Sequence, residues 1–208
     1  MDHVHVIEHP ILQRDLTILR RADTPFGVFR STLLDVSSIL AYEALRSIRM
    51  REVGIDTPLE PTLGHEVDEY VIVVPILRAG LGMVDGFVRF LPEARVGHLG
   101  MYRDENTHEP VDYYTSIPPG IEMARVFVVD PMLATGGSAA GAIDHLKRLG
   151  AQSIVLVTLV SAPEGIAFVH NAHPDVPLVT AVIDRELDEN AYIRPGLGDA
   201  GDRIFGTS

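Results

Sequence analysis

Four short runs of hydrophobic residues divide the chain at regular intervals. Val and Ile dominate these runs, and polar residues do not alternate with them, which is typical of parallel strands covered on both faces. Segments with a helical pattern separate the runs, and this alternation predicts an α/β fold around a parallel sheet. The four predicted strands are Tyr70–Pro75, Val126–Val129, Ser153–Val160 and Leu178–Ile183.

Three other segments carry helix signals. Between Ser31 and Val53, apolar residues recur every three to four positions, which predicts one amphipathic helix ended by Gly54. A second helix is predicted over Ala139–Leu149, with Gly150 as its C-terminal stop. The tetrapeptide Ser161–Glu164 has the pattern of a capping box, with a proline in the first turn of a third helix.

Composition limits what such a domain can do. The 208 residues favour a single domain, with an N-terminal arm and helix over residues 1–54. Lys and Arg number 17 against 29 Asp and Glu, a net charge of −12, so nucleic acid is not an expected partner. The chain has no Cys, which excludes disulfides, thiolate catalysis and Cys-ligated metals.

Membrane and export signals are not expected either. The longest apolar runs, Tyr70–Leu77 and Ile154–Val160, are far shorter than the ~20 residues of a membrane helix. The first ten residues lack a basic segment followed by an apolar one. The expected location is therefore the cytoplasm, with no membrane partner.

The most specific chemical signal follows the second predicted strand. The run Asp130–Ser138 ends in Thr-Gly-Gly-Ser and leads directly into a helix. Glycines let successive backbone N–H groups face a ligand, and a helix N-terminus favours negative charge, so the run is typical of a phosphate cradle. No Lys follows the glycines, which distinguishes it from a Walker A loop and favours a phosphate monoester. An ordinary strand-to-helix turn is the alternative.

Three further segments have chemistry of their own. Arg78 follows the first predicted strand and precedes a Gly-rich turn, where a guanidinium and backbone amides can bind a diphosphate. Tyr102–Ile117 is a long charged segment without a clear period, either a functional loop or a solvated hairpin. The glycines of residues 193–201 predict an irregular segment whose backbone can contact a planar ring.

These segments together resemble one family. Residues 128–138 resemble the phosphoribosyl-diphosphate loop of type I phosphoribosyltransferases, and the wording Pro131–Ser138 is similar to its uracil branch. Residues 75–82 resemble that family's diphosphate loop, residues 100–105 the start of its mobile hood, and residues 192–203 its uracil-binding segment. The resemblance spans essentially the whole chain and implies a type I phosphoribosyltransferase sheet with an N-terminal helical arm and a small C-terminal base-binding lobe, 185–208.

The resemblance also implies roles for individual residues. Asp130 and Arg103 are the implied catalytic residues. Uracil is expected at the backbone of Ile193, Gly198 and Ala200, with Asp199 near the ribosyl group. The expected ligands of 5-phospho-α-D-ribose 1-diphosphate (PRPP) are Arg78, Arg103, Asp130, Pro131, Met132, Leu133, Ala134, Thr135, Gly136, Gly137, Ser138 and Asp199.

The implied reaction joins uracil to PRPP and gives UMP and diphosphate. The resemblance implies Mg²⁺ held mainly by the substrate, and a homodimer or tetramer. Some relatives are activated by GTP, and the sequence leaves that regulation open. Many type I members have two adjacent acids where this chain has Val129–Asp130, so no general base is assigned there.

Other functions stay open at this point. A relative specific for another nucleobase would share most of these motifs, and a regulatory nucleotide- or RNA-binding protein could share the fold. The run Gly80–Gly86 also has a weak likeness to a dinucleotide fingerprint. Asp184–Arg185–Glu186 is interpreted as an ion pair at a subunit contact, and none of the nine histidines is assigned a catalytic role.

Overall fold

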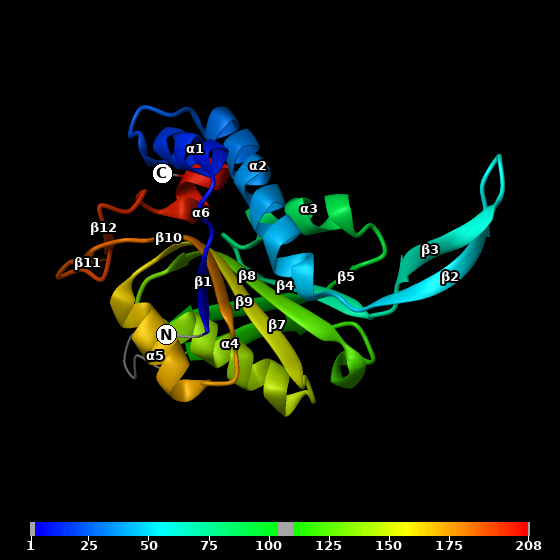
Figure 1. Ribbon diagram of the computed structural model, residues 1–208. Helices are drawn as coiled ribbons and strands as arrows, with labels where there is room; N and C mark the ends of the chain where they lie inside the picture. The colour runs from blue at the N-terminus through cyan, green and yellow to red at the C-terminus, as the bar shows by residue number, and fades with distance from the viewer. Residues whose placement is uncertain (1–2, 104–109, 208) are drawn as a thin grey trace.

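The computed structural model describes residues 3–103 and 110–207, except for the side chains of residues 101–103 and 110–113. Its main sheet has the strand order β1-β10-β9-β8-β4-β6-β7, with β5 also beside β4 (Figure 1). All described pairs in this sheet are parallel except β6 with β7. Its strands are β1 (Val4–Val6), β4 (Val71–Leu77), β5 (Arg95–Val96), β6 (His98–Arg103), β7 (Pro110–Ser116), β8 (Arg125–Leu133), β9 (Ser153–Ser161) and β10 (Leu178–Ile183).

Helices cover both faces of this sheet, as parallel strands require. Three helices, α1, α2 and α3, lie on one face, and α4 and α5 lie on the other (Figure 1). Short α6 lies near the C-terminus beside α2. The helices are α1 (Pro10–Arg20), α2 (Phe26–Ala44), α3 (Leu81–Phe90), α4 (Gly137–Arg148), α5 (Pro163–Ala172) and α6 (Ala200–Phe205), with 3₁₀ turns η1 (Leu45–Ser47) and η2 (Ile121–Met123).

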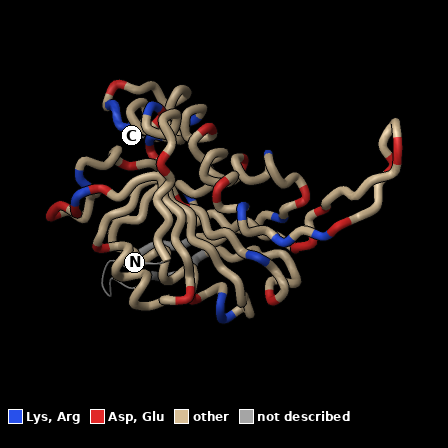
Figure 2. Tube along the Cα trace, viewed as in Figure 1, with Lys and Arg blue, Asp and Glu red and all other residues tan. Residues whose placement is uncertain are grey.

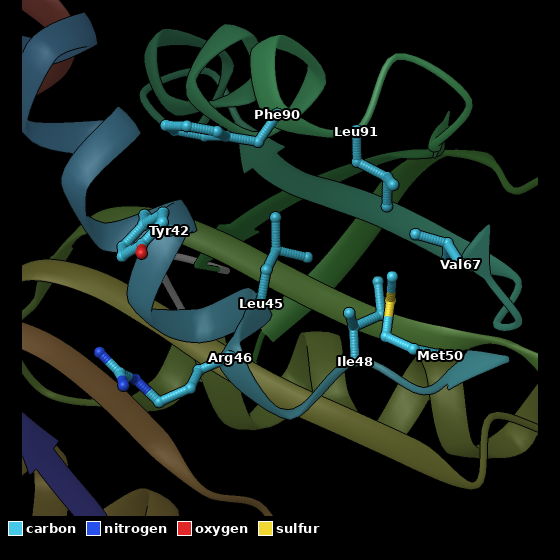
Figure 3. Close-up of a pocket in the computed structure, with 8 residues that line it drawn as sticks. All are labelled: Tyr42, Leu45, Arg46, Ile48, Met50, Val67, Phe90 and Leu91. Carbon is cyan, nitrogen blue, oxygen red and sulfur yellow. The ribbon is translucent and has the colours of Figure 1, made fainter. Parts of the chain in front are cut away.

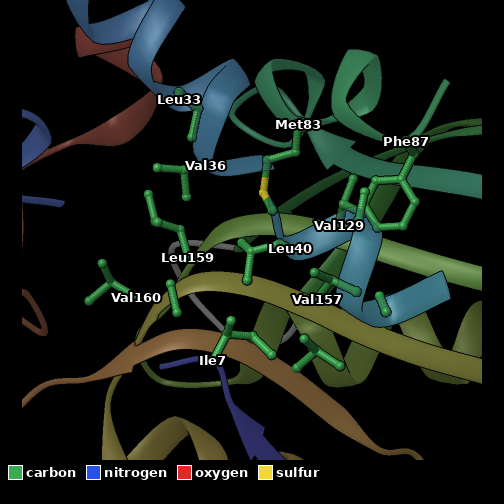
Figure 4. Packing of buried hydrophobic residues seen from close by; sticks show 14 of the residues in the cluster. Ile7, Leu33, Val36, Leu40, Met83, Phe87, Val129, Val157, Leu159 and Val160 are labelled. Carbon is green, nitrogen blue, oxygen red and sulfur yellow. The ribbon is translucent and has the colours of Figure 1, made fainter. Parts of the chain in front are cut away.

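The strands alternate their side chains between two hydrophobic clusters. In β8, Phe127 and Val129 face α2 and α3, whereas Val126 and Val128 face α4. Leu40 and Phe87 are fully buried over this first face, as Figure 4 shows. This two-sided burial explains why the sequence of the strands is continuously apolar. All four predicted strands are confirmed, and each pairs in parallel with its neighbours.

The predicted helix over Ser31–Val53 is correct only in its first part. Helix α2 ends at Ala44, and the chain then enters β2 (Met50–Asp56), which pairs antiparallel with β3 (Pro61–Val67). Gly54 is therefore a residue of this hairpin and not a helix stop. The hairpin projects from the body of the molecule and carries charges of both signs near its base (Figures 1 and 2). Its residues are mostly exposed on both faces, so the strand alternation that would predict it is missing.

Two smaller predictions at helix ends have different outcomes. Gly150 follows α4 with φ of +102°, which confirms it as the residue that ends the helix. The capping box at Ser161–Glu164 is wrong, because Ser161 belongs to β9 and its hydroxyl bonds to Thr158 and Thr180. Pro163 does begin α5, and the Glu164 carboxylate accepts a hydrogen bond from Leu187 N–H instead. Among the described residues, no helix combines the length and hydrophobicity needed to cross a membrane.

Candidate active site

The connections of the sheet reverse direction between β4 and β8. From β4 the chain moves outward to β6 on one side, and it then returns to place β8 on the other side of β4. In open α/β sheets, ligands bind beyond the carboxyl ends of strands at such a point. The two loops that the sequence associates with phosphate groups follow β4 and β8, so both lie at this edge of the sheet.

Asp130 lies within strand β8, three residues before its last residue, and not after the strand. The strand continues to Leu133, because Met132 and Leu133 remain paired with Val160 and Ser161 of β9. The Asp130 carboxylate accepts a hydrogen bond from Met132 N–H at 3.3 Å. Burial raises the pKa of this carboxyl group to about 7, and the Met132 hydrogen bond opposes that rise. Asp130 therefore changes charge near neutral pH.

The turn from β8 into α4 is built as a tight backbone loop. Gly136 has φ of +85°, and Thr135 Oγ1 accepts a hydrogen bond from Gly137 N–H at 3.4 Å. Ser138 is exposed at the start of α4, where the N–H groups of the first turn have no partner within the helix. This opening suits an anion, since the donors and the helix dipole both favour negative charge.

The same turn is held against helix α5. A Cβ atom at Gly165 would lie 2.3 Å from the carbonyl oxygen of Ala134, and one at Gly136 would lie 2.8 Å from that of Gly165. Neither position can carry a side chain without movement of the backbone. The turn from β8 into α4 is therefore fixed on one side by helix α5. Its other side faces the carboxyl edge of the sheet.

Arg78 and its Gly-rich turn lie beside strand β8 and beside the start of helix α6. The peptide bond between Leu77 and Arg78 is cis. The Arg78 side chain is 60% exposed, with its Nη2 atom 3.8 Å from Oδ1 of Asp202 in α6. Gly80 packs directly on the middle of β8, because a Cβ atom there would be 2.4 Å from the carbonyl oxygen of Val129. A Cβ at Gly201 would lie 3.9 Å from that of Ala79, so the turn also contacts the start of α6.

The C-terminal segment is more ordered than the sequence predicts. Ile193 lies in β12 (Ile193–Arg194), which pairs with β11 (Glu186–Leu187), and a short helix α6 follows, so the expectation of no regular element is wrong. Asp199 caps this helix, accepting a hydrogen bond from Asp202 N–H at 3.0 Å. Gly198 is exposed with φ of +80°, and Ala200 is buried. Asp202 therefore links the two site residues: its backbone N–H donates to the Asp199 carboxylate, and its own carboxylate lies near Arg78.

Arg103 is the one predicted site residue whose side chain lies outside the described part of the chain. Its backbone ends β6, and residues 104–109 also lie outside that part. The expectation of a loop over Tyr102–Ile117 needs correction at its end, because Pro110–Ser116 forms β7 and pairs antiparallel with β6. The described strands therefore form a hairpin, which is the backbone arrangement that the second alternative predicts.

The sequence does not predict Asp184 or Arg20 as site residues, but both side chains bond to Gly196, within the segment expected to contact uracil. The Asp184 carboxylate is buried and pairs with Arg20 of the same chain at 2.6 Å. The subunit contact expected for Asp184–Arg185–Glu186 stays a prediction. Arg185 pairs separately with Glu186 on the surface at 2.9 Å. The sequence signal for Asp184 is its place directly after β10, at the carboxyl edge of the sheet.

The cavity shown in Figure 3 is elsewhere. It has a volume of about 320 Å³ and lies between the end of α2, the base of the β2–β3 hairpin and the end of α3, where Tyr42, Ile48 and Phe90 line it. It contains none of the predicted site residues. In the described part of the chain, no three His, Asp or Glu side chains are grouped as metal ligands.

Comparison with known proteins agrees with this geometry. The model of one family, described as uracil phosphoribosyltransferase, matches residues 6–207. A Salinibacter ruber protein named uracil phosphoribosyltransferase is 66% identical over 207 residues, covering 100% of this chain and 99% of its own.

Two solved structures extend the comparison. The AQ2163 protein from Aquifex aeolicus superposes with a TM-score of 0.92 at 33% identity, covering 99% of both chains. An adenine phosphoribosyl transferase from Trypanosoma brucei, in complex with AMP, pyrophosphate and ribose-5-phosphate, superposes with a TM-score of 0.61 at 10% identity, covering 92% of this chain and 88% of its own. The second likeness concerns the fold alone, which is that of the type I phosphoribosyltransferases.

Proposed function

Because the chain belongs to the uracil phosphoribosyltransferase family, we propose that it transfers the phosphoribosyl group of PRPP to uracil and releases diphosphate. The product of this pyrimidine-salvage reaction is UMP. The observation that carries the proposal is the convergence of three segments at one edge of the sheet: the turn at Arg78–Gly80, the strand end and loop at Asp130–Ser138, and the start of α6. Each has the chemistry that one part of the substrates needs.

The loop after β8 is assigned to the 5-phosphate of PRPP. The first turn of α4 offers N–H donors at Ser138 and Ala139, and the hydroxyl of Ser138 is exposed beside them. Asp130 lies at the strand end before this loop, where its carboxylate can accept hydrogen bonds from the ribose hydroxyls. Holding the phosphate and the ribose at two points orients C1 toward the incoming base.

Arg78 and Arg103 are assigned to the diphosphate leaving group. In the reaction the bond between C1 and the diphosphate oxygen breaks, and a bond forms between C1 and uracil N1. N1 loses its proton in this step, and we assign no residue as the base that accepts it. Negative charge grows on the leaving diphosphate while the ribosyl centre becomes positive. A guanidinium at the diphosphate and the Asp130 carboxylate near the ribose each favour that separation of charge.

Uracil is assigned to the backbone of Ile193–Ala200. The ring edge of uracil alternates carbonyl acceptors and N–H donors, which backbone groups can match. Between Ile193 and Ala200 the chain has no Asn or Gln to act as a side-chain reader. The positive φ at Gly198 turns the backbone at this point, and Asp199 follows as the cap of α6 close to the ribosyl position.

Mg²⁺ is the proposed cofactor, brought mainly by PRPP. The donor set of the described residues fits that arrangement, since carboxylates such as that of Asp130 occur at the site but no three potential ligands are grouped there to hold a cation by themselves. When bound, the cation would neutralise charge on the diphosphate. Excess chelator should abolish activity, and added Mg²⁺ should restore it. Full activity in the chelator would contradict this part of the proposal.

We also propose that the chain acts as a homo-oligomer. The β2–β3 hairpin exposes Leu59 and Leu63 by 95% and 65% and contacts little of its own chain, and such a lone hairpin is marginally stable in water. A second copy would cover it. Light scattering should give at least twice the 22.8 kDa monomer mass, and a monomer at assay concentration would contradict it. Activation by GTP is tested in the same samples by assays with and without GTP.

The deciding experiment measures product formation from PRPP with uracil, hypoxanthine, guanine, xanthine and orotate. We expect UMP from uracil and no comparable product from the other bases. Faster turnover of another base would show that the chain is specific for that base. No turnover of any base would favour the alternative of a regulatory nucleotide-binding protein with the same fold. Arg78→Ala tests the diphosphate assignment in the same assay, and Arg89→Ala is its control for the general effect of losing a positive charge, because Arg89 is exposed in the last turn of α3.

A further inference from the structure

A buried ion pair holds both backbone groups of Gly196. Asp184, which follows β10, is 3% exposed in its side chain, and Arg20, the last residue of α1, is 24% exposed. The Arg20 guanidinium donates to both carboxylate oxygens of Asp184, at 2.6 and 2.8 Å. Asp184 Oδ2 also accepts from Gly196 N–H at 2.8 Å, and Arg20 Nη1 donates to the Gly196 carbonyl at 2.8 Å.

Gly196 lies in the middle of the segment assigned to uracil. It comes three residues after Ile193 and two before Gly198, and it has φ of +61°. A Cβ at Gly196 would be 2.2 Å from the carbonyl oxygen of Ile193, so the turn is closed tightly on itself. Fixing the peptide groups on both sides of Gly196 therefore fixes where Ile193 and Gly198 point their own backbone groups.

A second arginine holds the adjacent carbonyl from the other side. Arg203 in α6 donates to the carbonyl oxygen of Leu197 at 2.8 Å, to that of Arg21 at 2.6 Å, and to that of Leu19. Its guanidinium stacks on the Phe29 ring, 4.4 Å from the centroid. Leu19 and Arg21 flank Arg20, so the end of α1 serves as the common support for residues 196 and 197.

We propose that Arg20 and Asp184 are positioning residues for base recognition: their ion pair holds the turn at Gly196 so that the neighbouring backbone groups match uracil. Among the described residues, the hydrogen bonds and ion pairs of the two side chains join each other and Gly196, and none reaches the loops after β4 or β8, so the effect of the pair should be confined to the base. This inference rests on the proposed function, because it assigns the source of selectivity within the site for uracil.

The hydrogen bonds of the pair need side chains that can each make two contacts, so other residue types would not hold Gly196 in the same way. One carboxylate oxygen must accept from both a guanidinium and an amide, and one guanidinium nitrogen must reach both a carboxylate and a carbonyl. Arg has a planar fork of donors for this, whereas Lys has a single compact ammonium group. Truncation of either residue to alanine would leave its partner without both the charge and the hydrogen bonds of the pair. Arg20→Lys keeps the positive charge, and Asp184→Asn keeps the side-chain shape and one acceptor oxygen, so these two variants disturb the pair less than truncation does.

The test compares Arg20→Lys and Asp184→Asn with two matched controls. Arg21→Lys and Asp23→Asn alter a neighbouring ion pair at the same helix end, but those side chains are 63% and 74% exposed. We expect both test variants to raise KM for uracil at least tenfold, with KM for PRPP changed less than twofold, and both controls to match the wild type. Relaxed discrimination between uracil and cytosine should accompany the change.

Several outcomes would overturn the proposal. Test variants with wild-type kinetics would show that the pair does not position the base. An equal rise in both KM values, or a loss of kcat with both KM values intact, would indicate general loss of structure. If the wild type does not use uracil, the proposed function fails, and the inference about base positioning fails with it.

A second measurement needs no variant. Hydrogen exchange of the wild type should show slow exchange at the Gly196 amide, although it lies outside any helix or strand. The amide of Leu59 in the exposed turn of the β2–β3 hairpin provides the comparison. Exchange at Gly196 as fast as at Leu59 would contradict the fixed turn, even if every variant failed to fold.

Discussion

Gly80 packs so closely on strand β8 that a Cβ atom would lie 2.4 Å from the carbonyl oxygen of Val129, in the middle of the strand. The same atom would lie 2.7 Å from the backbone nitrogen and oxygen of Ile76 in β4. The turn that carries Arg78 thus rests on both strands that flank the reversal of the sheet. The residue next to Val129 is Asp130, so the turn that carries Arg78 is fixed by backbone contact relative to the part of β8 that carries Asp130.

Gly80→Ala should therefore weaken PRPP binding without removing any polar group. The added methyl meets backbone atoms, which cannot rotate away as a side chain can, so the turn must shift from β8. Overpacking of this kind costs roughly 1–3 kcal/mol of unfolding free energy. Urea unfolding and KM for PRPP are the measurements. Gly27→Ala is the control, since nothing lies within 4 Å of its added Cβ.

Arg78→Ala should raise KM for PRPP and lower kcat/KM, while KM for uracil changes little. Arg78 is largely exposed, and the one ion pair that it makes within the described part of the chain is the long contact to Asp202 at 3.8 Å, so its removal should leave the fold intact. A lost charge-assisted hydrogen bond corresponds to about 1.5–3 kcal/mol, or roughly a 10- to 100-fold loss. Unchanged kinetics with PRPP would remove Arg78 from the site.

Asp130→Asn should change the pH dependence of stability. The unfolded carboxyl titrates near 3.8, and burial raises the folded pKa to about 7. Between these values the folded state binds more protons than the unfolded state, so the wild type loses stability as pH rises from about 4 to about 7. Asn lacks this titration. Its stability relative to the wild type should increase by roughly 2–3 kcal/mol between pH 5 and pH 8.

The check on Asp130 is urea unfolding of both proteins at pH 5, 6, 7 and 8. A difference independent of pH would mean that the Asp130 pKa is close to 3.8 in the folded protein. Catalysis should respond in the opposite sense to stability. The ionised carboxylate is the better acceptor for ribose hydroxyls, so wild-type kcat/KM for PRPP should rise to a plateau above about pH 7. Asp130→Asn should be slow at every pH.

The strands and the phosphate loop could be predicted because their signals are local. Buried parallel strands must be apolar on both faces, and a loop that exposes its backbone must contain glycine, so both leave continuous marks in the sequence. The sequence predicts the end of β8 too early, at Val129, because the rest of the strand includes Asp130 and Pro131. Their place in the strand depends on pairing with β9, which lies more than twenty residues away.

The features that were missed depend on distant contacts or on exposure. The β2–β3 hairpin has no buried face, so it lacks the alternation that marks a strand, and Ile48 continued the helical period past Ala44 by chance. Arg20 and Asp184 are 164 residues apart, and neither has a local pattern that marks it as buried. Helix α6 is one and a half turns long, and its cap at Asp199 was interpreted only as a substrate contact.

Gly198→Val tests whether uracil is recognised by the backbone. Gly198 has φ of +80°, which a β-branched residue adopts only at a cost of about 1–2 kcal/mol or more, so valine should turn the peptide groups on either side. The nearest atom to an added Cβ is Arg203 Cδ at 3.8 Å, so the effect comes from the backbone and not from a clash. We expect a large rise in KM for uracil with KM for PRPP retained.

Ala200→Gly is the matched variant at the other end of this turn. It removes one methyl group but keeps the amide, so uracil kinetics should change only slightly. A backbone site that matches uracil would leave buried polar groups unpaired with cytosine, and the wild type should prefer uracil on the order of 10⁴-fold in kcat/KM. Full uracil activity in Gly198→Val, or comparable use of cytosine by the wild type, would place base recognition in another part of the chain.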